Sequence, residues 1–398
     1  PVHAYARRPG EKRSHPLRPG GETLASVGEI CRKHGPAYVT KYGGSMPFRQ
    51  RKVLRRLSVC RTGAAGGHVI ECVSCGQWHY RFHSCGDRNC PGCGGLAAAN
   101  WYHQQQKKLL NAPYFQLVFT LPSALRRIVR SNQKVLLPIL MKSVNAAIQT
   151  LAADPDIIGG QLGVIAVLHT WGRTLVYHPH VHCLIPAIAA DPDGNLILIN
   201  GKFLLPTRPL AVLFRAKFMQ AARAALPNLE FPQTLWDKQW YVHAQRALAP
   251  RLVLKYLAGY LYRTAISNGR VLAVTDQSVT FAYTDHNDGK HKTTTVSAEE
   301  FLRRFLQHVL PKGMHRVRYY GLINPKARDR LDALRQQLAK TPHPAGDPVS
   351  DDDQEQEPEW LPQCPHCGST DLLIIIADFP PITRGPPPPL PVMPRGNP

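Results

Sequence analysis

The stretch YHPHVHCLIP, residues 177–186, places histidines at positions 178, 180 and 182 and then continues with apolar residues. Successive side chains of a β-strand point to opposite faces, so these histidines share one face at steps of roughly 6.8 Å if the stretch is a strand. Val181 and Cys183 then face the other way, toward a core. The pattern therefore predicts a half-buried strand with a histidine-rich polar face.

Two imidazoles at neighbouring positions on one face, His180 and His182, can reach a single divalent ion. The alternative is a half-buried strand whose wet face happens to be rich in histidine, and His-x-His by itself leaves both open. His169, in the preceding predicted strand 162–171, can be a third ligand if the two strands pair, or an orienting or structural group. His178 precedes Pro179 at the start of the strand, so we expect it to contact solvent or DNA.

The surrounding residues alternate between helical and extended patterns. Glu22 to His34 has helical spacing with Thr23 as the expected N-cap, and Pro138 is expected to kink or break a helix over 124–152. Further helices are predicted at 208–226, 251–267 and 298–310, and strands at 114–122, 162–171, 180–190, 315–323 and, as a meander, between 270 and 297. This order predicts an α+β fold with a mostly antiparallel sheet and flanking helices.

Composition divides the chain into four regions. We expect a flexible basic arm at 1–21, an N-terminal helix with a cysteine-rich module at 22–96, and a catalytic domain at 97–325. A helix, an acidic linker, a CPHC knuckle and a proline-rich tail follow at 326–398.

The protein is strongly basic. Lys and Arg number 49 against 27 Asp and Glu, which gives a formal net charge of +22 and a sequence pI near 9.8. Such a field attracts polyanions, above all nucleic acid. No apolar run approaches the roughly 20 residues of a transmembrane helix, and the basic start does not lead into the apolar core of a signal peptide. We therefore expect a cytosolic protein that binds DNA and no membrane.

Six of the ten cysteines lie close together in the chain: Cys60, Cys72, Cys75, Cys85, Cys90 and Cys93. Two of the gaps are Cys-x-x-Cys, which in a cytosolic protein is typical of metal binding. We expect the knuckles 72–75 and 90–93 to fold toward each other and close a tetrahedral zinc shell. The residues left for a second site are Cys60, Cys85, His68, His79 and His83. A closed shell leaves no open position for substrate, so we assign the module to DNA docking. The tail knuckle, Cys364 and Cys367, lacks two further ligands nearby.

Tyr256 and Tyr260 are four residues apart in the predicted helix 251–267, and therefore lie on one helical face. The alternative is an amphipathic helix whose aromatic residues simply pack in a core. A His-x-His strand together with a Tyr-x-x-x-Tyr helix in one basic protein indicates a nuclease that uses tyrosine.

This combination resembles the HUH endonuclease superfamily, named for its His-hydrophobic-His motif, here His180-Val181-His182. More narrowly, the chain resembles the two-tyrosine transposases of the insertion-sequence-91 family, over residues 25–325. The matching blocks are CRTGAAGGHVIECVSCG (60–76), SCGDRNCPGC (84–93), PYFQLVFTLP (113–122), LHTWGRTLVYHPHVHCLIP (168–186), KYLAGYLYRTAISNGRV (255–271) and GMHRVRYYGLI (313–323). Two positions depart from the family pattern: Asn89 stands where His is common, and Gly259 where Arg is common.

The resemblance implies rolling-circle transposition in the bacterial cytoplasm, in association with the nucleoid. His180 and His182 would hold a divalent metal ion, Mg²⁺ or Mn²⁺, at the scissile phosphate of single-stranded transposon ends or target DNA. Tyr256 or Tyr260 would attack the phosphorus and form a 5′-phosphotyrosine. Two readings from other classes are a zinc-dependent DNA-binding regulator without catalysis, and a metal-dependent hydrolase that uses a metal-bound water. The second needs carboxylates near the strand, and Asp191 and Asp193 lie only beyond its end.

Overall fold

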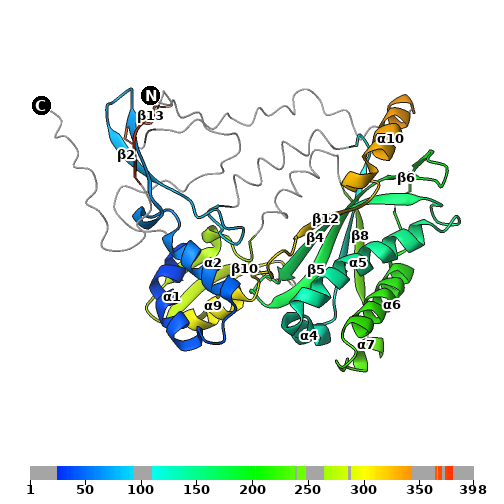
Figure 1. Ribbon diagram of the computed structural model, residues 1–398, viewed down its shortest axis with the longest axis horizontal. Helices are drawn as coiled ribbons and strands as arrows, with labels where there is room; N and C mark the ends of the chain where they lie inside the picture. Colours follow the sequence, from blue (N-terminus) through cyan, green and yellow to red (C-terminus); the bar gives the residue numbers. More distant parts are fainter. Residues whose placement is uncertain are drawn as a thin grey trace, which may run out of the picture. The chain divides into compact units, whose positions relative to one another are not determined.

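The computed structural model (Figure 1) describes residues 25–93, 110–201, 203–237, 240–247, 264–285, 288–341, 364, 366–369 and 373–379. The chain forms two compact units that interleave along the sequence. We call them the cysteine-rich unit (Pro1–Asn100, Tyr262–Val309 and Glu355–Pro398) and the sheet unit (Trp101–Leu261 and Leu310–Gln354). The three consecutive domains expected at 22–96, 97–325 and 326–398 have other boundaries than these units. Residues 262–309 and 355–398 belong to the cysteine-rich unit, although they follow the first part of the sheet unit in sequence.

The sheet unit contains a seven-stranded sheet in which every described pair of neighbouring strands is antiparallel. Its strand order is β7-β6-β4-β5-β3-β8, and β12 also pairs with β4. The strands are β3 (Tyr114–Thr120), β4 (Gln161–Trp171), β5 (Tyr177–Pro186), β6 (Ile188–Ala190), β7 (Leu196–Leu198), β8 (Tyr241–Ala247) and β12 (Val317–Gly321). The predicted α+β class with a mostly antiparallel sheet is confirmed.

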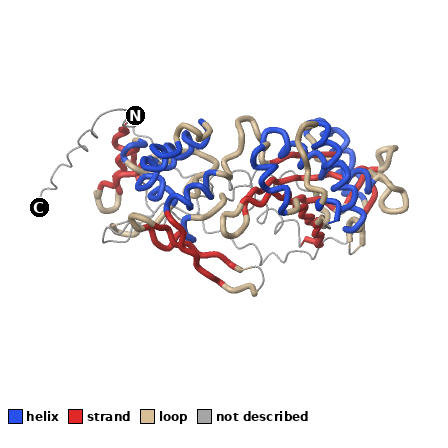
Figure 2. Tube along the Cα trace, turned by 90° about the horizontal axis from the view of Figure 1, so that it is seen from below, coloured by secondary structure: helices blue, strands red, loops and turns tan. Residues whose placement is uncertain are grey.

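Two long helices, α5 (Gln133–Ala152) and α6 (Thr207–Ala225), lie along one face of this sheet (Figures 1 and 2). The strand residues that alternate toward them, among them Leu117, Leu168 and Val181, are fully buried in one core with both helices. Phe119 meets Phe214 of α6 edge to face, with ring centroids 5.3 Å apart. Burial of this apolar face fixes the register of the strands, since a shift by one residue would move every side chain of a strand to the opposite face of the sheet.

The helical stretch before β4 breaks at Asn132 rather than at Pro138, which lies inside α5. A short 3-10 turn, η2 (Ser123–Leu125), and α4 (Arg126–Ser131) precede the break. The Asn132 side chain donates to the Ile128 carbonyl at 3.0 Å and so satisfies the end of α4. By length and composition alone α5 could cross a membrane, contrary to the expectation that no segment could. Its apolar face packs against α6 and β4, which accounts for its hydropathy.

The cysteine-rich unit is built from helices and two three-stranded sheets. Its helices are α1 (Val27–Tyr42), α2 (Phe48–Val59) and α9 (Ala298–Leu306). One sheet has the order β13-β1-β2, from β1 (Gly67–Cys72), β2 (Trp78–Phe82) and β13 (Leu373–Phe379), and the other is the predicted meander of β9 (Val271–Val274), β10 (Ser278–Thr284) and β11 (His291–Ser297).

The meander belongs to this unit because it packs with α1 and α9. Phe281 and Phe301 meet edge to face with centroids 5.8 Å apart, and His34 contacts the Thr275 carbonyl at 3.0 Å. The N-cap of α1 is Ser26, whose hydroxyl accepts from the Glu29 N–H. The expected N-cap, Thr23, lies outside the described residues.

The remaining elements of the sheet unit are α7 (Thr234–Asp237), η4 (Pro325–Ala327) and α10 (Arg328–Lys340). Those of the cysteine-rich unit are η1 (Gly63–Ala65) and η3 (Asn268–Arg270).

Candidate functional site

Three histidines meet on the face of the sheet opposite α5 and α6. The pairing of β4 with β5 sets His169 directly opposite His180, and Val167 opposite His182. One nitrogen from each of His169, His180 and His182 lies within 4.8 Å of the other two. The condition for a third ligand, that the two predicted strands pair, is therefore met. In the part of the chain that the structure describes, this group contains no carboxylate.

His180 is held in the tautomer that metal binding needs. Its Nδ1 lies 2.7 Å from the His178 carbonyl oxygen, and a carbonyl can only accept, so Nδ1 carries the proton. Nε2 then has a free lone pair. Burial lowers the pKa of His180, which keeps the ring neutral near pH 7. A neutral imidazole with Nε2 unprotonated is the form in which histidine coordinates a cation.

His182 contacts an amide pair that reaches back across β3 to β8. Gln116 Nε2 lies 3.4 Å from His182 Nδ1, and Gln116 Oε1 accepts from Gln245 Nε2 at 2.7 Å. Coordination through His182 Nε2 requires a proton on Nδ1. Gln116 Oε1 would accept that proton if both amides were turned over, in which case Gln116 Nε2 would donate to Gln245 Oε1 and the bond between the two amides would be kept. Gln116 is 6% exposed, so it can orient His182 with little competition from water.

His178 and His169 differ in their surroundings. Arg126 Nη2 donates to His178 Nδ1 at 2.9 Å; burial, then His180 and Arg126, lower the pKa of His178 to about 4. His178 lies outside the group of three. His169 is 2% exposed. Its ring stacks on Trp171 with centroids 4.6 Å apart, and Arg316 lies 5.1 Å from that indole. His169 is thus held rigidly beside the other two rings.

Tyr256 and Tyr260, the predicted nucleophiles, lie outside the described residues, as does Gly259. The predicted helix over 251–267 does not include residues 264–267, which are not helical. Asp191, considered above for hydrolysis, accepts from the Asn195 backbone N–H at 2.7 Å and from its side chain at 2.8 Å, in the turn between β6 and β7.

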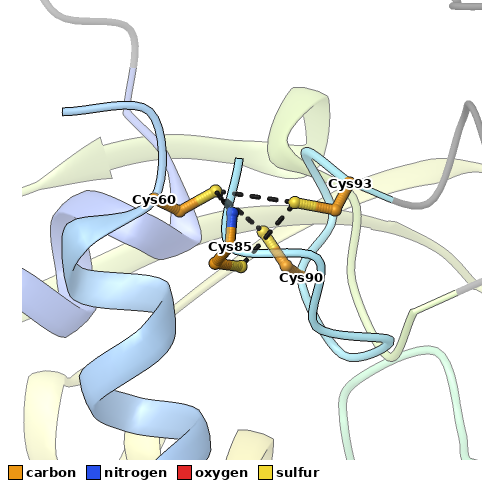
Figure 3. Close-up of side chains that lie close together, drawn as sticks. All are labelled: Cys60, Cys85, Cys90 and Cys93. Carbon is orange, nitrogen blue, oxygen red and sulfur yellow. Dashed lines mark hydrogen bonds between the residues drawn. The ribbon is translucent and has the colours of Figure 1, made fainter. Parts of the chain in front are cut away.

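Eight of the ten cysteines form two groups of four, and the expected pairing of the knuckles is wrong. Cys90 and Cys93 lie with Cys60 and Cys85 (Figure 3), whereas Cys72 and Cys75 lie with Cys364 and Cys367. The reason is the β1–β2 hairpin, which has the 72–75 knuckle at its turn. Arg61 and His83 pair across the other end, with Arg61 N donating to the His83 carbonyl at 3.0 Å. Cys60 and Cys85 are therefore brought together at one end and Cys72 and Cys75 are carried to the other, roughly 20 Å along a six-residue strand.

The spacing in the first group fits a tetrahedral metal shell. Sulfur–sulfur distances are 3.6 Å for Cys60–Cys93 and for Cys60–Cys90, and 3.7 Å for Cys85–Cys93. Four sulfurs at the usual zinc distance of about 2.3 Å from one ion are about 3.8 Å apart. Hydrogen bonds from the Cys85 and Cys90 thiols lower the pKa of Cys60 to about 7, while the pKa values of Cys85 and Cys90 are raised. Without a cation, the four thiols cannot all ionise together.

Asn89 is not needed as a ligand in this group. Its backbone N–H and its side-chain amide both donate to Asp87 Oδ1, each at 2.9 Å. Asp87 in turn lies 3.8 Å from Arg56 of α2. The residue that replaces the family's common histidine therefore shapes the loop that carries Cys85 and Cys90.

Comparisons with known proteins match two stretches of the chain. The family "Transposase zinc-binding domain" matches residues 30–121, and the family "Putative transposase" matches residues 163–330. The chain is 37% identical to a putative transposase of Sinorhizobium fredii over 376 residues, which cover 88% of this chain and 94% of the relative. It is 28% identical over 317 residues to the transposase for insertion sequence element IS801 of Pseudomonas savastanoi pv. phaseolicola, with 72% of this chain and 73% of that protein covered. No solved structure matches.

The sheet with its histidine group and the unit with its cysteine groups are thus those of a transposase with a zinc-binding domain. The chain belongs to the insertion-sequence-91 family of transposases, as its sequence motifs indicated. A DNA-cleaving and strand-transferring activity, DNA as the partner and a structural zinc follow from this membership.

Proposed function

We propose that the protein nicks and rejoins single-stranded DNA at transposon ends through a 5′-phosphotyrosine intermediate, in rolling-circle transposition. The observation that carries the proposal is the group of His169, His180 and His182, whose nitrogens converge on one point of the sheet. The formal net charge of +22 suits a substrate made of phosphates.

The three imidazoles would hold a divalent ion, Mn²⁺ or Mg²⁺, with His169 as the third ligand. His180 fits this role because its Nδ1 proton is committed to a carbonyl oxygen and its Nε2 is free. When bound, such an ion acts as a Lewis acid that polarises the scissile phosphate. Gln116 orients His182, and the indole of Trp171 fixes the plane of His169.

The nucleophile in this proposal is the phenol oxygen of Tyr256 or Tyr260. It attacks phosphorus as it loses its proton to solvent or a nearby base, the bond from phosphorus to the 3′ oxygen breaks, and that oxygen takes up a proton to become a free 3′-OH. The other tyrosine accepts the second strand or ends the transfer. Rejoining is the reverse attack, by a 3′-OH on the phosphotyrosine.

The first cysteine group, Cys60, Cys85, Cys90 and Cys93, would bind the structural zinc of the DNA-docking module. Its sulfur spacing is that of a closed four-thiolate shell, which leaves no position for substrate. Close by, α2 carries Arg51, Lys52, Arg55 and Arg56, and such basic side chains suit a DNA backbone.

The test is formation of a covalent protein–DNA adduct. The full chain is incubated with Mn²⁺ and labelled single-stranded DNA from the element's ends, and the adduct is separated under denaturing conditions. We expect an adduct that is reduced in Tyr256→Phe or Tyr260→Phe, absent in the double variant, and absent in His180→Ala/His182→Ala. Binding without any adduct would instead favour a DNA-binding regulator. Free cleaved ends in the double Phe variant would favour a hydrolase that uses water.

A further inference from the structure

The second cysteine group joins two segments that are far apart in the chain. Cys72 Sγ lies 3.8 Å from Cys367 Sγ, and Cys75 Sγ lies 3.7 Å from Cys364 Sγ. All four sulfurs lie within 4.8 Å of one another. These two sulfur–sulfur distances match the spacing of about 3.8 Å expected around one tetrahedral zinc ion. They are too long for disulfides, whose sulfurs are about 2.05 Å apart.

We propose that Cys72, Cys75, Cys364 and Cys367 bind a second zinc ion, distinct from the one held by the Cys60 group. The matched zinc-binding domain ends at residue 121, so two of these four ligands lie far beyond it. The site extends the proposed function without depending on it, because a structural zinc can be present whether or not the tyrosines react.

The backbone supports this assignment, because both knuckles have the same turn. Each reads Cys-x-x-Cys-Gly, and the glycine has a positive φ of 62° at Gly76 and 74° at Gly368. In each, the glycine N–H donates to the carbonyl of the first cysteine, at 2.8 Å for Cys72 and 2.9 Å for Cys364. A glycine is required there because side chains disfavour this conformation. The turn presents two thiols on one side, so two facing turns complete a tetrahedron.

Contacts around the sulfurs join the two knuckles further. Ser74 and Ser369 hydrogen-bond through their hydroxyls at 2.8 Å. His79 Nε2 lies 3.1 Å from Cys364 Sγ, where an N–H donor stabilises a metal-bound thiolate. Among the side chains that the structure describes, the buried cluster here consists of Ile70, Cys72 and Cys364, with Cys75 packed against it. A metal ion held by the four thiols would add stability that a cluster of this size does not supply alone.

Strand β13 follows the tail knuckle and pairs with β1 in antiparallel register from Gly67↔Phe379 to Cys72↔Leu373. His68 of β1 contacts Asp378 of β13 at 2.8 Å. The tail therefore covers the edge of β1 that the β1–β2 hairpin alone would leave unpaired. The second zinc would close a loop that contains the whole sheet unit, since residues 101–261 and 310–354 all lie between the two knuckles in sequence.

The test is the zinc content of the full chain, measured by elemental mass spectrometry. The histidine group is removed first with His180→Ala/His182→Ala so that it cannot contribute. We expect two zinc ions per chain in this background, and one after Cys364→Ser/Cys367→Ser. Cys72→Ser/Cys75→Ser should also leave one, and all four changes together should still leave one. His366→Ala, an exposed residue inside the tail knuckle, should keep two and serves as the matched control.

One zinc ion in the background chain, or two in the tail-knuckle variant, would overturn the proposal. X-ray absorption of the background chain, with all ten cysteines intact, gives a readout that does not depend on how the cysteine variants fold. We expect about four sulfurs at about 2.3 Å per zinc, and a lower sulfur count would overturn the assignment. Neither measurement involves DNA, so failure here is distinguishable from failure to form the phosphotyrosine adduct.

Discussion

Gln116→Leu should weaken metal binding at the histidine group without unfolding the sheet. Gln116 of β3 lies 3.4 Å from His182 Nδ1 through its Nε2, and it is 6% exposed. Loss of a partner that orients a metal-binding histidine typically costs about 10–100-fold in metal affinity. That range corresponds to about 1.4–2.8 kcal/mol of binding free energy.

The cost to stability should be smaller. Leucine has a similar size, and the amide of Gln245, which loses its partner, is exposed and can bind water instead. Each neutral hydrogen bond contributes about 1 kcal/mol to the free energy of unfolding, so loss of the two bonds described, offset by the buried leucine, should lower it by less than about 2 kcal/mol. Gln245→Leu is the matched control, because it leaves Gln116 in contact with His182, and it should reduce metal affinity less.

The assay is titration with Mn²⁺, with free Mn²⁺ followed by electron paramagnetic resonance and adduct formation followed in parallel. In Gln116→Leu, the Mn²⁺ concentration for half-maximal binding should rise 10–100-fold, while the adduct rate at saturating Mn²⁺ returns to that of the unchanged protein. An unchanged binding curve would refute the role of Gln116 in orienting His182. A maximal rate that stays low at saturating Mn²⁺ would refute it too, since an orienting residue acts through the metal.

Three further outcomes follow from the described contacts. Adduct formation should need a lower concentration of Mn²⁺ than of Mg²⁺, because imidazoles bind Mn²⁺ more readily than Mg²⁺; equal requirements would argue against three histidine ligands. Cys90→Ser should remove one zinc ion and lower the melting temperature of the cysteine-rich unit, whereas Cys31→Ser, a buried cysteine outside both groups, should keep its zinc in the same measurement. Leu140→Ala, in the core face of α5, should lower the free energy of unfolding by about 2–5 kcal/mol with zinc content unchanged, and a denaturation midpoint equal to that of the unchanged protein would contradict the packing described.

Most strands and helices could be predicted from the sequence because their patterns are strong. The predicted strand over 114–122 is β3, and that over 162–171 is β4. One helix boundary was predicted at the wrong residue, because its position depends on a single polar side chain. Asn132, and not Pro138, ends the helix before α5, because its amide finds a carbonyl to bond. The allocation of the meander to the cysteine-rich unit could not be predicted, because it rests on contacts such as Phe281 with Phe301 and His34 with Thr275 rather than on adjacency in the chain.

The pairing of the cysteines failed for a topological reason. Three Cys-x-x-Cys-Gly knuckles, beginning at Cys72, Cys90 and Cys364, have the same spacing, so spacing alone cannot say which two meet. The informative signal was the stretch GHVIEC, residues 67–72, which contains the β-branched pair Val69 and Ile70 and forms a strand that pairs with WHYRF, residues 78–82. A hairpin centred on the first knuckle separates that knuckle from Cys60 and Cys85.

The position of His169 follows from the core on the other side of the sheet. The alternation Val164, Ala166, Leu168 is buried against the helices, together with Cys183 and Val181 of β5. Ala166 pairs with Cys183 and Leu168 with Val181, so the next residue, His169, must pair with His180 on the opposite face. A shift of one residue would put the imidazole into the apolar core and a leucine beside His180 and His182. The alternation of apolar residues in β4 and in β5 is visible in the sequence, but the register between the two strands is not. That register, fixed by the buried face, decides which histidine lies beside His180 and His182.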